Sequence, residues 1–283
     1  MALSKIFLFV KDEIDTIQAW IVHHSKIVGI NNLFIIDNGS TDGTLQIIKR
    51  YPEINLFYCD DFNQKEKKLN ELMTLEKETA DLLIPLDGDE FLSVKKNSDY
   101  ILQPQEVKEY FNKKLDEWLK SNSGILSISE YLLSFPRNEK QNKIDEIDLF
   151  YSQNENSYAY FKQFSKIFFL AKDFLSTDGG NHNGKTLSGN NGKETTELVI
   201  FHLWNLGWEK LYQKEIKSCI ARGYDVENES ELEKLMDLKA KSWHKIMNVL
   251  HYKRGTLQNY WQDELDKSVT INEFRNYMKT LVV

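Results

Sequence analysis

The sequence predicts an α/β protein built on a Rossmann-like, mainly parallel sheet flanked by helices. The first observation is a series of short apolar runs of strand length, at residues 6–10, 33–36, 54–58 and 82–86. The second is helical periodicity in the segments between these runs. Strands that alternate with helices form right-handed βαβ units, and such units produce a parallel sheet.

Three connecting helices are expected in the first half of the chain. Residues 14–28 place isoleucine and valine side chains on one helical face, and Gly29 follows as a stop signal. Residues 44–50 and 65–80 predict two further helices. This first domain has the organisation of a nucleotide-binding domain.

Later segments predict further elements around this sheet. A helix is expected at residues 104–120, and strands are expected at residues 124–128, 162–170 and 198–202. Residues 138–156 are polar and predict a loop. Residues 173–193 are rich in glycine and asparagine, so no regular element is expected there.

The C-terminal part of the sequence is expected to be helical. Helices are predicted at residues 208–221 and 230–253, and Thr270 with Glu273 has the spacing of a capping box that opens a final helix. We therefore expect a catalytic domain over residues 1–205 and a C-terminal helical region over residues 206–283 that packs on it.

Composition narrows the class of protein. The chain has 283 residues, 41% hydrophobic and 28% charged, which is enough to bury a core without disulfides. The formal net charge of −7 argues against a general nucleic-acid binder, because such proteins need a basic surface. Cys59 and Cys219 lack the spacing of a metal or redox motif, which indicates reduced cysteines and a cytoplasmic protein.

No transmembrane segment is expected from the N-terminal apolar run. Residues 6–10 are followed at once by charged residues, so the run is too short for a signal-peptide core and far too short to span a bilayer. Peripheral association with the inner face of a membrane stays open.

The stretch Leu86-Asp87-Gly88-Asp89-Glu90-Phe91 is the strongest functional signal. Three acidic residues surround one glycine directly after a buried strand, where open α/β sheets bind their ligands. Carboxylates on a tight turn suit Mg²⁺ or Mn²⁺, whose other positions are usually filled by water and phosphate oxygens. An acidic surface turn would explain the charges but not their position after an apolar strand. The stretch therefore predicts a site for a metal-bound di- or triphosphate.

Two other strand ends carry polar side chains. Val10 to Glu13 follows the first predicted strand, and Asp37 to Asp42 follows the second. Since the carboxyl ends of parallel strands lie at one edge of the sheet, all three stretches are expected to converge. Taken singly, Asp37 or Glu13 is more often a helix cap than a ligand contact.

The order of these motifs resembles that of the GT-A glycosyltransferases of the family 2 type. The stretch Asp37-Asn38-Gly39-Ser40-Thr41-Asp42-Gly43-Thr44 and the acidic turn are similar to those of a bacterial branch with D-N-x-S-x-D-G-T and L-D-x-D-E-F motifs, close to family 92. The resemblance implies that Glu13 and Asp37 hold the base and ribose, that Asp87 approaches the ribose and the metal, and that Asp89 ligates Mn²⁺ or Mg²⁺. The full set of donor-binding residues it implies is Val10, Lys11, Glu13, Asp37, Asn38, Ser40, Asp87 and Gly88.

A late histidine completes the metal site in folds of this kind. His202 ends an apolar strand before Leu203 and Trp204 and matches that position, so the expected metal ligands are Asp87, Asp89 and His202. His182, in a glycine-rich loop, is the rival and is expected on the acceptor side. A single histidine is more often a structural residue, and only the upstream motifs favour a ligand role.

An inverting transfer also needs a base near the acceptor hydroxyl. Asp178, His182 and Glu130 are the candidates, and Asp178 is preferred because it lies on the glycine-rich loop. The expected activity is transfer of a sugar from a nucleoside-diphosphate sugar, with UDP as the implied nucleotide, to a saccharide or glycolipid hydroxyl. The setting implied by the resemblance is bacterial surface polysaccharide or lipooligosaccharide synthesis.

Two alternatives belong to other classes. The stretch around Asp87 also resembles the D-x-D motif of haloacid-dehalogenase-like phosphohydrolases, in which Asp87 would be a nucleophile. That motif lies on the first strand of its domain, whereas complete βα units precede it here. The other alternative is a non-catalytic protein that binds nucleotide sugars.

Overall fold

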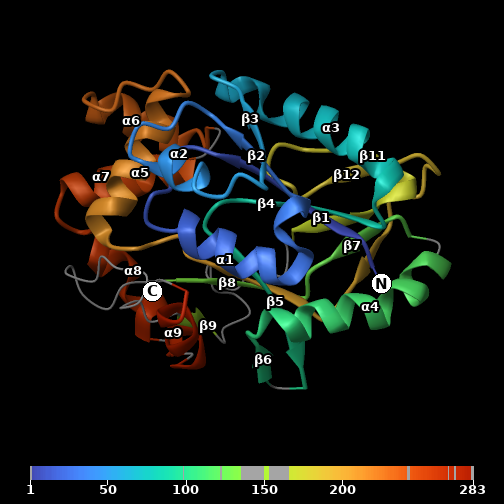
Figure 1. Ribbon diagram of the computed structural model, residues 1–283. Coiled ribbons are helices and arrows are strands. Elements are labelled where there is room, and N and C mark those ends of the chain that lie inside the picture. The colour runs from blue at the N-terminus through green and yellow to red at the C-terminus, as the bar shows by residue number, and fades with distance from the viewer. Residues whose placement is uncertain are drawn as a thin grey trace. The chain divides into compact units, whose positions relative to one another are not determined.

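The computed structural model describes residues 2–97, 99–121, 123–134, 150–152, 166–240, 243–266, 268–270 and 272–281 (Figure 1). The chain divides into two compact units. Unit 1 comprises Met1–Leu132, Phe161–His202 and Asn276–Val283, and unit 2 comprises Leu133–Tyr160 and Leu203–Arg275. The domain boundary expected at residues 205–206 falls close to the passage from His202 to Leu203, but unit 2 also takes in an earlier segment.

Unit 1 has a mixed α/β architecture with a mostly parallel central sheet flanked by helices, as predicted. The strand order is β13-β7-β10-β4-β1-β2-β3. The strands are β1 (Ser4–Val10), β2 (Leu33–Asp37), β3 (Asn55–Tyr58), β4 (Leu82–Leu86), β7 (Ile125–Ser127), β10 (Ile167–Leu170) and β13 (Lys193–Thr195). Strands β4, β1, β2 and β3 are parallel, whereas β10 runs antiparallel to both of its neighbours. The side chains of β1, β2 and β4 are buried along the whole strand, which explains their continuous apolar runs.

Two helices of unit 1 contact β1 of this sheet, and two others pack against the first of them. They are α1 (Ile17–Val28), α2 (Thr44–Ile48), α3 (Lys65–Glu76) and α4 (Pro104–Lys120). Alternation along β1 places Phe7 and Phe9 on the face that packs against Leu69 of α3. Helix α1 ends at Gly29, whose φ of +88° lies in the region that favours glycine, as the stop signal predicted.

A second sheet in unit 1 follows directly from the acidic turn. Its order is β6-β5-β14-β8, with β5 (Glu90–Lys96), β6 (Asp99–Ile101), β8 (Glu130–Leu133) and β14 (Leu198–His202). Strand β14 was predicted, and it pairs antiparallel with β5, which was not predicted. The acidic turn therefore joins β4 of the central sheet to β5 of a different sheet.

Two predictions about irregular segments were wrong. Within residues 173–193 the chain forms an antiparallel pair, β11 (Phe174–Thr177) and β12 (Gly184–Thr186). The glycine- and asparagine-rich composition gave no sign of these strands, because each is short and is stabilised by pairing with the other. In the loop expected at residues 138–156, β9 (Phe150–Ser152) pairs with β15 (Ser268–Thr270). The remainder of that loop, apart from its described strand, and the start of the strand expected at residues 162–170 lie outside the described residues.

Unit 2 is mainly helical in its described residues. It contains α5 (Trp208–Ile220), α6 (Glu229–Asp237), α7 (Trp243–Lys253) and α8 (Leu257–Asp266), while α9 (Asn272–Lys279) passes from unit 2 into unit 1. The single helix predicted at residues 230–253 is two helices, and Lys239, with a φ of +48°, lies after the first of them. In the described part of the chain, no helix combines the length and apolarity needed to cross a membrane.

Candidate active site

The central sheet brings the three predicted stretches to one edge. Strand β1 lies between β4 and β2, with Leu8 beside Leu86 and Val10 beside Asp37. A β-carbon placed on Gly88 would lie 3.3 Å from Cγ of Glu13 and 3.5 Å from Cγ2 of Val10. The acidic turn therefore passes close to the segment that follows β1, and the absence of a side chain at Gly88 allows this approach.

The acidic turn is held by its own backbone and by one carboxylate. The N–H of Glu90 donates to the carbonyl oxygen of Asp87 over 3.1 Å, and the N–H of Asp87 donates to Oε2 of Glu90 over 2.9 Å. The indole N–H of Trp20, on α1, donates to the same carbonyl of Asp87 over 3.0 Å. Glu90 is fully buried and therefore acts as part of the frame of the turn.

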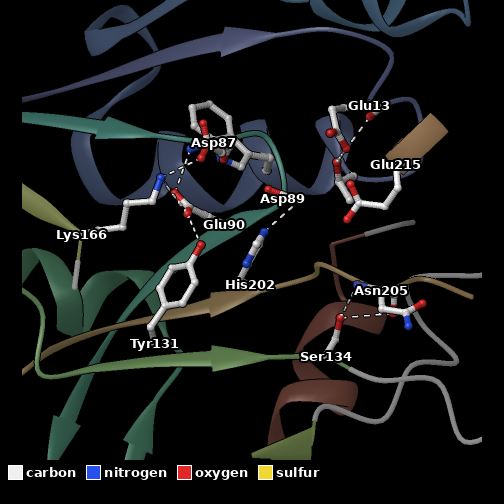
Figure 2. A network of polar contacts seen from close by, with 12 residues as sticks. Glu13, Asp87, Asp89, Glu90, Tyr131, Ser134, Lys166, His202, Asn205 and Glu215 are labelled. Carbon is white, nitrogen blue, oxygen red and sulfur yellow. Dashed lines mark hydrogen bonds and ion pairs between the residues drawn. The ribbon is translucent and has the colours of Figure 1, made fainter. Parts of the chain in front are cut away.

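Two lysines neutralise this frame, and Figure 2 labels one of them, Lys166. Lys166 Nζ lies 2.7 Å from Asp87 Oδ2 and 3.0 Å from Glu90 Oε1, and Lys65 Nζ lies 2.9 Å from Asp87 Oδ1. Burial alone would raise the pKa of Asp87, but Lys166 and Lys65 hold that pKa well below its usual value. Burial would lower the pKa of Lys166, and the two carboxylates raise it instead. Asp87 and Lys166 are therefore charged at neutral pH.

Asp89 points to a different partner. Its Oδ2 lies 3.1 Å from Nε2 of His202, the last residue of β14. Strand pairing sets this approach, because His202 lies opposite Glu90 in the β5–β14 ladder. Tyr131 lies beside the pair: its ring centroid is 5.1 Å from that of His202, and its hydroxyl donates to Glu90 (Figure 2).

The structure thus brings together two of the three expected metal ligands. The carboxylate of Asp87 is occupied by lysines, and among the described residues no group of three or more His, Cys, Asp or Glu side chains is arranged to hold a metal ion. A carboxylate next to an imidazole nitrogen nevertheless fits Mn²⁺. Two protein ligands are also a usual number for a cation that completes its shell with phosphate and water.

The end of β2 forms the second part of the site. Asp37 Oδ2 accepts the backbone N–H groups of Gly39 and Ser40 over 3.0 and 3.1 Å. Asp37 Oδ1 and Asn38 Oδ1 are buried and have no hydrogen-bond partner among the described residues. Such acceptors are costly to leave unsatisfied, so they indicate a missing donor.

The neighbouring predicted residues shape the loops around this end. The carbonyl oxygen of Val10 accepts the N–H of Asn38 over 2.8 Å, and the N–H of Asp12 donates to Oγ of Ser40 over 3.1 Å. The N–H of Glu13 donates to Oγ1 of Thr44 over 2.8 Å. Lys11 is exposed.

Asp178 and His182 lie on one turn between β11 and β12. Asp178 Oδ1 accepts the backbone N–H groups of Gly180 and His182, and Oδ2 accepts from the side chain of Asn183. These bonds outweigh burial and lower the pKa of Asp178, so this carboxylate is a weak base. Burial and the nearby Lys166 lower the pKa of His182, so its imidazole is neutral at pH 7. The turn thus offers His182 as a base and Asp178 as the residue that shapes its loop.

The third candidate base is engaged elsewhere in unit 1. Glu130 pairs with Lys95, and the hydroxyl of Tyr100 donates to its Oε2 over 2.7 Å.

Neither Lys166 nor Lys65 was assigned a role from the sequence. The signal for Lys166 was available: it is a single charged residue directly before the apolar run of β10. A lysine at that place can be buried with the strand only if it meets an opposite charge.

Comparison with known proteins gives only remote likeness. No protein-family model matches the chain, and no curated protein matches it. Among solved structures, glucosyl-3-phosphoglycerate synthase from Mycobacterium tuberculosis, in complex with Mn²⁺ and UDP-glucose, is 16% identical with a TM-score of 0.30, covering 46% of this chain and 44% of that one. A mycobacterial protein is 12% identical with a TM-score of 0.36, covering 71% and 65%.

A cytidylyltransferase from Leptospira borgpetersenii serovar Hardjo-bovis is 13% identical with a TM-score of 0.27, covering 45% of this chain and 54% of that one. This chain spans less than two thirds of the length of each of these three structures. At such scores no activity is transferred from them to this chain.

Proposed function

We propose that the chain is a metal-dependent glycosyltransferase of the GT-A type that uses a nucleoside-diphosphate sugar, with UDP as the nucleotide. The reaction proposed is transfer of the sugar to a saccharide or glycolipid hydroxyl with inversion. The observation that carries the proposal is the Asp89–His202 pair, in which Asp89 lies on the acidic turn after β4 and His202 ends β14.

The metal proposed is Mn²⁺, with Mg²⁺ as the alternative, held by Asp89 and His202. An imidazole ligand favours Mn²⁺ over Mg²⁺. When bound, the cation neutralises charge on the departing diphosphate. Asp87 and Glu90 are balanced by Lys65 and Lys166, so Asp89 provides the carboxylate charge that a cation would meet.

The nucleoside is proposed to bind at the end of β2. Asp37 Oδ1 and Asn38 Oδ1 are acceptors without a donor among the described residues, and a uracil N–H or a ribose hydroxyl would supply one. Asp87 would approach the ribose and the metal, while Glu13 would border the base. Val10, Lys11, Ser40 and Gly88 complete the donor-binding set.

On the acceptor side, we assign the base to His182. Its neutral imidazole would take the proton of the acceptor hydroxyl as that oxygen forms a bond to the anomeric carbon and the bond from this carbon to the diphosphate oxygen breaks. The nucleoside diphosphate leaves with the bonding electrons. Asp178 is a positioning residue in this scheme, because its carboxylate holds the backbone N–H of His182.

The deciding experiment is a panel of nucleotide sugars incubated with the wild type and with Asp89→Ala, with and without Mn²⁺. We expect Mn²⁺-dependent hydrolysis of one UDP-sugar by the wild type, and loss of metal-dependent UDP binding in Asp89→Ala. The matched control is Asp116→Ala, which removes an exposed carboxylate of α4 and should behave as wild type.

Other outcomes would overturn the proposal. Release of phosphate from simple phosphomonoesters, with an acyl-phosphate on Asp87, would make the protein a phosphohydrolase. UDP-sugar binding without hydrolysis or transfer to any acceptor would make it a binding protein. UDP binding with the same metal requirement in Asp89→Ala would remove Asp89 from the site.

The biological setting proposed is cytoplasmic assembly of a bacterial surface polysaccharide or lipooligosaccharide, with peripheral contact to the inner membrane face. The support for this setting is the motif resemblance of residues 37–44 and 86–91. Transfer to glycolipid acceptors in vesicles, compared with soluble saccharides, tests it.

A further inference from the structure

We propose that the buried side chains Trp20, His23 and His24 of α1 act as positioning residues for the acidic turn, and we call them the α1 clamp. They occupy positions i, i+3 and i+4 of one helix, so they share a face. All three are almost completely buried. The proposal rests on the proposed function, because the element that the clamp positions is the turn that carries Asp89.

The clamp contacts the backbone on both sides of Asp89. Trp20 Nε1 donates to the carbonyl oxygen of Asp87, as described above. On the other side, the N–H of Leu92 donates to Nε2 of His24 over 3.4 Å, and Nε2 of His23 donates to the carbonyl oxygen of Leu92 over 2.8 Å. One helix therefore fixes the turn at both of its ends.

These contacts assign the tautomer of each histidine. A carbonyl oxygen only accepts, so His23 carries its proton on Nε2 and its Nδ1 accepts from the hydroxyl of Tyr277 over 2.7 Å. A backbone N–H only donates, so His24 carries its proton on Nδ1 and donates to the carbonyl oxygen of Trp20 over 2.9 Å. Both rings are neutral in this arrangement.

The clamp takes the place of a neighbouring strand. On one side of β5, Leu92 lies opposite Ile200 of β14. On the other side, β6 pairs with β5 only from Val94 to Lys96. Without the imidazoles, the backbone groups of Leu92 on that side would be buried without partners, which is costly.

The consequence for the site is geometric. Asp89 lies on the clamped turn, whereas His202 lies on β14, so their 3.1 Å separation depends on where the turn is held. A metal site needs its ligands fixed to within a fraction of an ångström. Tyr277, on α9, extends the clamp through its bond to His23.

The test uses Trp20→Phe, which keeps an aromatic ring and removes only the donor to Asp87. The matched control is Ser93→Ala: Ser93 is equally buried on β5, but its hydroxyl donates to Ile101 of β6 and not to the turn. Two quantities are measured below the thermal midpoint: Mn²⁺ affinity in the presence of UDP, and hydrogen exchange of the backbone amides of residues 88–92 without metal.

For Trp20→Phe we expect the rate of amide exchange in the turn to rise about fivefold and the Mn²⁺ affinity to fall about fivefold. A change of this size is expected because one hydrogen bond is lost. Ser93→Ala should leave both unchanged while lowering the thermal midpoint. If Trp20→Phe does not fold, Tyr277→Phe decides by the same criteria, with a smaller effect.

The inference is overturned if amide exchange in the turn is unchanged in the variant, or if Ser93→Ala raises it equally. The two proposals fail separately. A wild type that does not bind Mn²⁺ removes the proposed function, whereas the metal-free exchange measurement still decides whether the clamp holds the turn.

Discussion

The ammonium group of Lys166 lies 2.7 Å from Oδ2 of Asp87, across a sheet in which their strands run in opposite directions. Strand β10 pairs with β4 through Phe169 opposite Leu83 and Leu170 opposite Leu82. The residue before β10 therefore arrives at the carboxyl end of β4. An antiparallel strand thus brings a cation to the edge where the parallel strands bring their carboxylates.

Replacing Lys166 by methionine should strongly destabilise unit 1. The substitution leaves Asp87 and the fully buried Glu90 without their shared cation, and breaking a buried ion pair in this way costs about 3–5 kcal/mol. Urea denaturation measures the free energy of unfolding. Lys67→Met is the control because it removes an exposed lysine from a pair with Glu71, and it should not change stability measurably. Equal effects of the two substitutions would contradict this account.

The course of the chain explains which parts of this site the sequence could predict. Asp37 and Asp87 follow parallel strands, and the rule that such strand ends share an edge placed both correctly relative to β1. That rule could not place Lys166, because β10 runs antiparallel to β4 and Lys166 precedes it. Its partner strand could only be known from the tertiary fold.

His202 illustrates a different limit. Its position at a strand end was predicted, but the strand belongs to a second sheet that β5 begins. Strand β5 starts inside the acidic turn itself, so the charged residues that marked the turn concealed the strand. The contacts of the α1 clamp with Leu92 could not be predicted for the same reason. They are made at an edge of β5, and β5 itself was not predicted.

Asp37→Asn should separate ligand binding from stability. Its amide oxygen can still accept from Gly39 and Ser40, but the second position becomes an N–H donor in place of the acceptor Oδ1. We expect UDP affinity to fall by about tenfold or more, because a donor of the ligand would then face a donor. The free energy of unfolding should change little.

Calorimetric titration with UDP and Mn²⁺ measures this effect. Asp42→Asn is the matched control, because the oxygens of Asp42 accept from Ile14 and Thr44 within the neighbouring loop. Wild-type UDP affinity in Asp37→Asn would exclude Oδ1 from the nucleoside site.

His202→Ala should weaken Mn²⁺ binding while leaving UDP contacts at β2 in place. Loss of one ligand of two predicts a decrease in Mn²⁺ affinity of some tens of fold. Titration of the free Mn²⁺ signal by electron paramagnetic resonance measures it. His182→Ala is the control, since we assign that histidine to proton transfer. If Mn²⁺ affinity falls in His182→Ala and not in His202→Ala, His182 is the metal ligand and His202 is not.

The free energy of unfolding should decrease as the pH is lowered, and His23 is the cause. Burial lowers the pKa of this residue from 6.5 to about 4 in the folded protein, outweighing its hydrogen bond to Leu92. Between these values the unfolded chain binds the proton and the folded chain does not, so folding is favoured above pH 6.5 and loses stability as the pH falls toward 4. The full loss from this shift is about 3 kcal/mol.

Urea denaturation of the wild type and His23→Gln across this pH range isolates the effect. Glutamine offers a donor and an acceptor but does not titrate. Ionisable groups other than the adjacent His24, whose pKa His23 helps to lower, contribute equally to both proteins. The advantage of the wild type should therefore shrink as the solution is acidified, and the two curves should approach each other by pH 4. Parallel curves would mean that His23 is protonated in the folded state, which would be incompatible with the acceptor role of its Nδ1 toward Tyr277.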